Sequence, residues 1–249
     1  MTRRRTALTT TQLAMTPIFT ALVAIVTMAF TISVPATTGY FNVGEGVIYI
    51  AAILFGPYVG AISGGVGAAI SDALLAPIYW PGTLIIKATE GAIVGFLGRR
   101  AIKAGSKIRW KTFTLALGLV TGALLTVIGL IYYTGPVQLF LGIPPPSQPT
   151  VTVFVPFEFW YLLGALVFVV TAYVGVRSEP KLGWLVLVIF LGGLEMVTGY
   201  FLYETIALGN LLAILEVPVN IGQFLIGLII AIPVARTVRR TLPMLEQTP

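Results

Sequence analysis

Apolar segments long enough to cross a lipid bilayer make up most of this chain, and few folds can accommodate them. A membrane-spanning helix needs about 20 apolar residues, and its backbone groups bond within the segment. We identify eight candidate segments, near residues 13–34, 43–55, 58–76, 83–98, 112–133, 154–176, 182–203 and 211–235. The pattern predicts an all-α polytopic membrane protein with eight membrane elements, in which residues 1–249 form a single integral membrane domain.

The basic residues divide the gaps between these segments into two kinds. Fourteen of the 15 lysines and arginines lie in alternate gaps: Arg3, Arg4 and Arg5; Arg99, Arg100, Lys103, Lys107, Arg109 and Lys111; Arg177 and Lys181; and Arg236, Arg239 and Arg240. Basic loops stay on the cytoplasmic side of a membrane. We therefore expect an even number of spans in the cell membrane, with both termini in the cytoplasm. The remaining lysine, Lys87, falls inside a candidate span.

Composition excludes several classes of function. The chain is 57% hydrophobic and 10% charged, whereas soluble domains carry about 25% charged residues, so we expect the lipid bilayer to be its solvent. Cysteine and histidine are absent, which removes thiol and imidazole chemistry, and we expect no metal site and no cofactor. The net charge is +6, but the positive residues lie in short loops between spans, which does not favour nucleic-acid binding.

Most of the acidic residues gather at one depth. Seven of the nine fall in the outer halves of the candidate spans or at their outer ends: Glu45, Asp72, Glu90, Glu158, Glu195, Glu204 and Glu216. An ionisable group inside a membrane costs about 2.5–3.5 kcal/mol on insertion scales. Several such groups at one depth indicate a polar cavity or mutual pairing, and we expect the cavity to open outward.

The fourth segment carries a polar stripe. Thr83, Lys87 and Glu90 are spaced i, i+4, i+7, which places them on one face of a helix. Lys87 can pair with Glu90 on its own helix, or with Asp72 across the short outer loop. The stripe either forms a buried ion pair that fixes helix register or contacts a ligand, and the sequence favours neither.

The last segment repeats this spacing. Glu216, Asn220 and Gln223 again lie at i, i+4, i+7, and an acid with two amides can hydrogen-bond a ligand or join helices. We favour ligand contact for Asn220. The short outer loops beside the acidic positions hold four aromatic residues, Tyr40, Phe41, Tyr79 and Trp80. Such residues typically form an interfacial belt, and these four can alternatively form a lid over a flat ligand.

The third segment is rich in small residues. Gly60, Gly64 and Ala68 recur at every fourth position, which lets another helix backbone approach closely. Packing within the chain is the favoured interpretation. A docking face for another subunit is the alternative.

Several motifs occur in an order typical of one transporter family. The run FNVGEGVIYIAAILFGP (residues 41–57) precedes the small-residue segment, then Ser71-Asp72, PGTLIIK (81–87) and Glu90-Gly91. Near the C-terminus come Gly199-Tyr200-Phe201 and EVPVNIGQ (216–223). Together these motifs resemble the S components, or substrate-binding membrane subunits, of energy-coupling factor (ECF) vitamin transporters. The resemblance is to the riboflavin-type branch in particular, and it covers about two-thirds of the chain.

The resemblance implies an architecture and a set of partners. Residues 13–100 and 182–238 would form a six-helix S-component-like core, with an inserted helical hairpin at about 101–181. Such a subunit captures a vitamin or a vitamin-like small molecule from outside. It delivers this substrate across the membrane together with a transmembrane coupling subunit and two ATP-binding subunits.

The resemblance also suggests roles for single residues. Asn220 and Gln223 match ligand-binding positions on the family's last helix, and Glu90 matches an acid that some members carry on the fourth. The family's pattern of alanines on helix 1, which contacts the coupling subunit, is replaced here by Thr20 and Ala24. The candidate substrate-binding residues are Asn220, Gln223, Glu216, Glu90, Lys87, Tyr40, Phe41 and Trp80. The candidate docking residues are Thr20, Ala24, Gly60, Gly64 and Ala68.

Two other classes of function remain to be weighed. The chain has no glycine-rich loop followed by Lys-Ser/Thr, so ATP hydrolysis would fall to partner chains. A self-sufficient secondary transporter or channel that uses intramembrane carboxylates is the main alternative. An enzyme is least favoured, because no nucleophile–base pair is recognisable. The surplus of acids favours a neutral or cationic, partly aromatic substrate over an anion.

Overall fold

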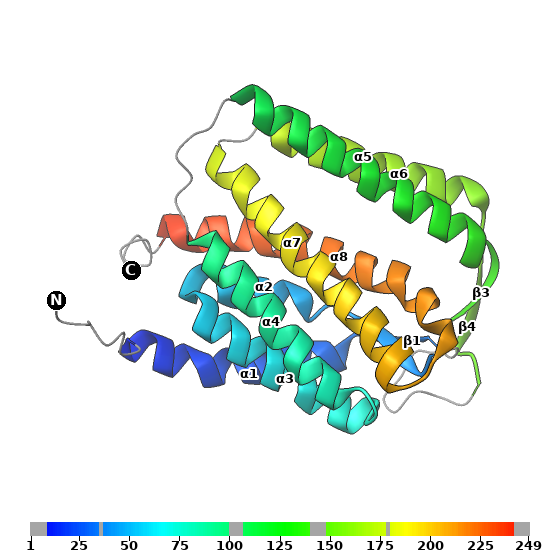
Figure 1. Ribbon diagram of the computed structural model, residues 1–249, viewed down its shortest axis with the longest axis horizontal. Coiled ribbons are helices and arrows are strands. Elements are labelled where there is room, and N and C mark those ends of the chain that lie inside the picture. The colour runs from blue at the N-terminus through cyan, green and yellow to red at the C-terminus, as the bar shows by residue number, and fades with distance from the viewer. Residues whose placement is uncertain (1–8, 35–36, 100–106, 140–147, 178–179, 242–249) are drawn as a thin grey trace.

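The computed structural model describes residues 9–34, 37–99, 107–139, 148–177 and 180–241, and it is a bundle of long helices (Figure 1). The helices are α1 (Thr10–Ala29), α2 (Glu45–Phe55), α3 (Pro57–Leu75), α4 (Trp80–Gly98), α5 (Lys107–Tyr132), α6 (Phe157–Arg177), α7 (Pro180–Leu202) and α8 (Glu216–Thr241). Each of the eight apolar segments thus contains a helix. Two antiparallel pairs of strands lie between helices. β1 (Thr31–Val34) pairs with β2 (Gly39–Asn42) between α1 and α2, and β3 (Gly135–Leu139) pairs with β4 (Val151–Val155) between α5 and α6.

The chain is a multi-pass membrane protein. Among the described residues, five helical stretches are long and apolar enough to cross a bilayer: Thr10–Ala29, Pro57–Leu75, Lys111–Tyr132, Gly183–Ala207 and Leu211–Thr241. α2 is shorter, with 11 residues, but ten of these are buried by the surrounding helices. A short helix at membrane depth is tolerated when protein rather than lipid surrounds it.

The outer connections differ in part from the prediction. The first segment was expected to remain helical to residue 34, but α1 ends at Ala29, and residues 31–34 form β1 because they pair with β2. The connection between α5 and α6 contains the extended strands β3 and β4. Its three consecutive prolines, Pro144 to Pro146, lie outside the described residues.

The helices divide into two groups by their contacts. α1, α2, α3, α4, α7 and α8 pack against one another, and α3 with α4 is the most extensive pair. α5 and α6 pack chiefly against each other and reach the first group mainly through α7 and α8 (Figure 1). The largest apolar cluster lies in the first group, where the rings of Phe190 and Phe224 meet at 5.3 Å.

The small residues of α3 allow close approach within the chain. A Cβ at Gly60 would lie 2.7 Å from the Gly91 carbonyl oxygen of α4, and one at Gly64 would lie 2.8 Å from that of Lys87. Ala68 is buried in a cluster with Val23 of α1. The faces that carry these three residues are therefore covered by α1, α2 and α4. Internal packing accounts for the row, and subunit docking through it stays a prediction.

The candidate docking residues of α1, Thr20 and Ala24, lie where the backbone of α1 approaches α3. Ala24 is buried, and its carbonyl oxygen accepts a hydrogen bond of 3.1 Å from Ser71 of α3. The carbonyl oxygen of Thr20 would lie 2.7 Å from a Cβ at Gly67, also on α3. The backbone at Thr20 and Ala24 thus packs α1 against α3, and a docking role for these residues stays a prediction.

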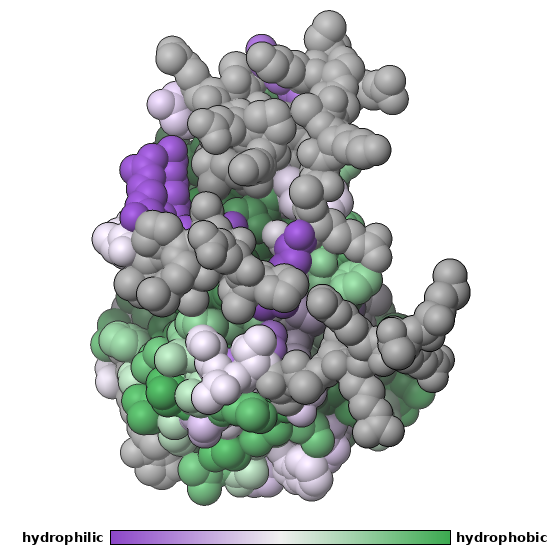
Figure 2. All heavy atoms as spheres, turned by 90° about the vertical axis from the view of Figure 1, so that its left-hand side faces the viewer, coloured by the Kyte–Doolittle hydropathy of each residue, from purple (hydrophilic) through white to green (hydrophobic). Residues whose placement is uncertain are grey.

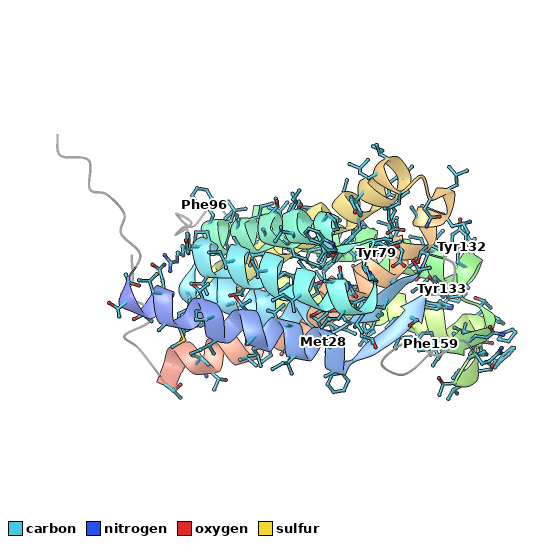
Figure 3. All side chains as sticks on the ribbon, turned by 90° about the horizontal axis from the view of Figure 1, so that it is seen from below. Met28, Tyr79, Phe96, Tyr132, Tyr133 and Phe159 are labelled. Atoms are coloured by element: carbon cyan, nitrogen blue, oxygen red, sulfur yellow. The ribbon has the colours of Figure 1, made fainter. Side chains whose placement is uncertain are left out.

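The two ends of the bundle differ in character. At one end, carbonyl oxygens at the end of α2 accept hydrogen bonds from Gln12, Arg99 and Arg239, so the start of α1 meets the ends of α2, α4 and α8. Figure 2 looks onto this end, where hydrophilic side chains show among hydrophobic ones. The two hairpins lie at the opposite end; Figure 3 shows Phe96 towards the first end and Tyr79 and Tyr133 towards the second.

Candidate ligand-binding site

A pocket of about 340 Å³, including the part open to solvent, lies at the hairpin end of the bundle. It is lined by side chains or backbone from β2, α3, the loop before α4, α7, the single π-helical turn η1 (Tyr203–Ala207) and α8. The lining residues are Gly39, Tyr40, Asn42, Asp72, Tyr79, Tyr200, Glu204, Glu216, Asn220 and Gln223. Three tyrosines, three carboxyl groups and three side-chain amides therefore face one space.

The polar stripe of α8 forms one wall of this pocket. Glu216, Asn220 and Gln223 all line it and are all buried, as their i, i+4, i+7 spacing predicts for one helical face. The Gln223 Oε1 accepts hydrogen bonds from the backbone N–H and the side-chain amide of Asn42, at 2.7 and 2.9 Å. Gln223 therefore holds β2 against α8, while its own amide nitrogen lies 3.3 Å from the Asn220 Oδ1.

The opposite wall is organised by Asp72 of α3. The hydroxyls of Tyr40 and Thr83 donate to its two carboxylate oxygens, and the Thr83 hydroxyl lies 2.9 Å from that of Tyr200. Burial and the neighbouring Asp72 carboxylate raise the pKa of Tyr40 above its ordinary value. Tyr40 therefore remains protonated and acts as a donor, which fixes its ring at the pocket wall.

Lys87 and Glu90 do not line the pocket. The Lys87 ammonium forms ion pairs with Glu45 and, at 3.3 Å, with Glu90, which also accepts a hydrogen bond of 2.6 Å from the Tyr49 hydroxyl. Of the two partners considered for Lys87, Glu90 is confirmed, and the second partner in the structure is Glu45 instead of Asp72. This buried cluster joins α2 to α4, and it corresponds to the structural alternative for the α4 stripe. The Lys87 ammonium also lies 5.4 Å from the ring centre of Tyr200.

Two of the four outer-loop aromatic residues, Phe41 and Trp80, are absent from the pocket lining. Phe41 lies between Tyr40 and Asn42 on β2, and successive strand residues point to opposite faces. Trp80 is 45% exposed at the start of α4. Tyr40 and Tyr79 do line the pocket, and the Tyr79 hydroxyl donates to the Thr37 carbonyl oxygen at 2.7 Å.

Six lining residues were not among the candidate substrate-binding residues: Gly39, Asn42, Asp72, Tyr79, Tyr200 and Glu204. Asp72 and Glu204 belong to the group of outer acids, and Tyr200 to the motif Gly199-Tyr200-Phe201. Neither pattern separates pocket residues from their neighbours, because helical spacing relates only residues of the same helix. Their convergence depends on how α3, α7 and α8 pack.

Comparison with known proteins gives two similarities. Residues 7–178 match the family described as "ECF-type riboflavin transporter, S component". This stretch includes the residues of α1 to α6 and ends before α7 and α8. A Pyrococcus woesei protein described as "Uncharacterized protein in gap 3'region" is 39% identical over 107 residues, which are 43% of this chain and 67% of that protein.

Proposed function

The chain belongs to the family of ECF-type riboflavin transporter S components, and on this premise we propose that it is the substrate-binding subunit of an ECF-type importer. It captures a vitamin or vitamin-like small molecule and delivers it across the cell membrane with partner subunits. The observation that carries this proposal is the polar pocket, which α8 lines with Glu216, Asn220 and Gln223.

The pocket suits a small, partly aromatic ligand. Tyrosine rings offer flat apolar surfaces, and the amides of Asn220 and Gln223 offer both donors and acceptors. We propose Tyr40, Asn220, Gln223 and Glu216 as ligand contacts. Lys87 and Glu90 act instead as the buried support that holds α2 and α4 in register.

We propose the following arrangement in the membrane. Residues 13–100 and 182–238 form the S-component core, and about 101–181 form an inserted hairpin, which accords with the mutual packing of α5 and α6. The hairpin is tied to the pocket end, because the Tyr133 hydroxyl donates to the Leu215 carbonyl oxygen at 2.7 Å, directly before Glu216. The basic end of the bundle, with both termini, faces the cytoplasm, so the pocket opens to the outside.

Energy for transport comes from other chains. Because this sequence lacks a phosphate-binding loop, we propose that a transmembrane coupling subunit and two ATP-binding subunits complete the importer. The main competitor is a self-sufficient secondary transporter, since buried carboxylates such as Glu45 and Glu90 can relay ions.

Partner dependence separates these two functions. We expect the purified protein to bring down the coupling subunit and both ATP-binding chains, and we expect vitamin uptake only in cells that express all of them. A matched control expresses the partners without this chain. Full uptake by this chain in a host that lacks the partners would contradict the importer proposal and support a secondary transporter.

A further inference from the structure

We propose that Glu204 binds a positively charged group of the ligand, so that the pocket selects a flat aromatic cation over a neutral molecule of the same shape. This inference rests on the proposed function, because it concerns the same pocket. It assigns a specificity-determining residue and a ligand class.

The first observation is an unpaired oxygen on a buried carboxyl group. Glu204 lines the pocket and is 1% exposed, and its Oε2 has no hydrogen-bond partner among the residues that the structure describes. Burying a carboxylate without a partner is costly, so such a group indicates a partner that arrives from elsewhere. Glu45 and Glu195 also have an unpaired oxygen, but neither lines the pocket.

The other two carboxyl groups of the pocket differ from Glu204 in their hydrogen bonds. Asp72 accepts hydrogen bonds on both oxygens, from Tyr40 and Thr83, and Glu216 accepts one on its Oε1 from Thr37. Among the described pocket residues, Glu204 is the acid whose Oε2 is buried without a hydrogen-bond partner. A ligand N–H carrying positive charge is the strongest donor for such an oxygen.

The charge balance around the pocket points in the same direction. Lysine and arginine do not occur among the pocket-lining residues, and Lys87, behind the Tyr200 ring, is held by Glu45 and Glu90. The pocket therefore repels anions and favours cations. Its tyrosine rings add to this preference, because aromatic faces attract cations.

The backbone at Glu204 departs from regular α-helical geometry. α7 passes into the π-helical turn η1, and the Glu204 carbonyl oxygen accepts a hydrogen bond of 2.9 Å from the Asn210 N–H. Single π-helical turns occur frequently at functional sites, because they rotate the side chains that follow relative to the preceding helix. Glu204 thus lies in η1, beyond the end of α7, and lines the pocket from there.

Two flat tricyclic probes of opposite character test the proposal. Proflavine is a cation and lumichrome is neutral, and their binding to the purified protein in a neutral detergent is measured by fluorescence titration. We expect the wild-type protein to bind proflavine at least about tenfold more tightly than lumichrome. Glu204→Gln, which keeps the shape and removes the charge, should abolish this preference by weakening the binding of proflavine about tenfold or more. Glu158→Gln, at an exposed position on α6, is the matched control and should behave as the wild type.

Equal or tighter binding of lumichrome by the wild type, no binding of proflavine, or an unchanged preference in Glu204→Gln would each overturn the inference. Thermal melts of the variants confirm that they are folded. The proposed function fails by a different result, which is uptake without partner subunits. Partner-dependent uptake combined with no preference for the cation would reject the role of Glu204 alone.

Discussion

Lys87 illustrates how a charged side chain can lie inside a membrane-embedded bundle. It is 3% exposed, and its ammonium is paired with Glu45 and Glu90, which come from two different helices. The Tyr49 hydroxyl donates to Glu90 and adds a further hydrogen bond to the same group. A buried charge of this kind is acceptable only when it is paired and hydrogen-bonded.

Replacing Lys87 should therefore destabilise the protein. Lys87→Met leaves two buried carboxylates without their cation, and breaking a buried pair in this way costs about 3–5 kcal/mol. We expect a clear fall in the melting temperature of the detergent-solubilised protein. The triple variant Lys87→Met, Glu45→Gln, Glu90→Gln is the control and should recover much of the loss. A Lys87→Met protein that melts like the wild type would show that the cluster does not hold the helices together.

At this scale, the sequence predicts neighbours on one helix better than partners on different helices. The spacing of Glu216, Asn220 and Gln223 was sufficient to place all three on one wall of the pocket. The pairing of Lys87 with Glu90 follows from the same rule, but its pairing with Glu45 does not, because that contact depends on how α2 packs against α4. Glu204 lacks such a pattern, since its position depends on a π-helical turn.

At the scale of the elements, glycines allow the backbones of α3 and α4 to pack in close contact. Gly60 and Gly91 face each other closely, and a Cβ at Gly60 would also lie 2.7 Å from the Cβ of Ala52 on α2. Close backbone approach of this kind replaces the hydrophobic driving force, which is absent between helices in lipid.

Adding one methyl group at this contact should be harmful. Gly60→Ala would force α3 away from both α2 and α4, at a cost of about 1–3 kcal/mol for overpacking. We expect a lower melting temperature than that of the wild type. Gly222→Ala is the matched control within α8, where the nearest atom would lie 3.7 Å away in ordinary contact. Equal melting temperatures for the two variants would contradict the assignment of Gly60 to internal packing.

The elements also show where local sequence patterns fail. Residues 31–34 continue the apolar character of α1, yet they form β1 because β2 offers a pairing strand. Such pairing is a tertiary effect that no single segment encodes. By contrast, the Gly56-Pro57 turn was predictable, since Gly56 has a φ of 89°, which favours glycine, and Pro57 begins α3.

In the whole molecule, the two ends of the bundle carry different kinds of polar residue, and this difference relates the structure to the proposed function. At one end, Arg99 and Arg239 donate hydrogen bonds to carbonyl oxygens at the end of α2. At the other end lie the acids, amides and tyrosines of the pocket. This division is what a subunit that binds its substrate on one side of the membrane requires. The sequence predicted the division, but the convergence of distant segments on one pocket required the three-dimensional arrangement.

Native mass spectrometry of the purified protein tests the central claim most directly, because it detects a small molecule retained in the pocket. We predict that the wild type, purified from vitamin-rich cells, carries one small molecule per chain. Asn220→Leu should lose it at an unchanged melting temperature, because a ligand polar group left unpaired weakens binding by about 1–3 kcal/mol, roughly tenfold or more. Wild-type protein without any retained molecule, or Asn220→Leu with undiminished occupancy, would contradict the assignment of this pocket as the substrate site.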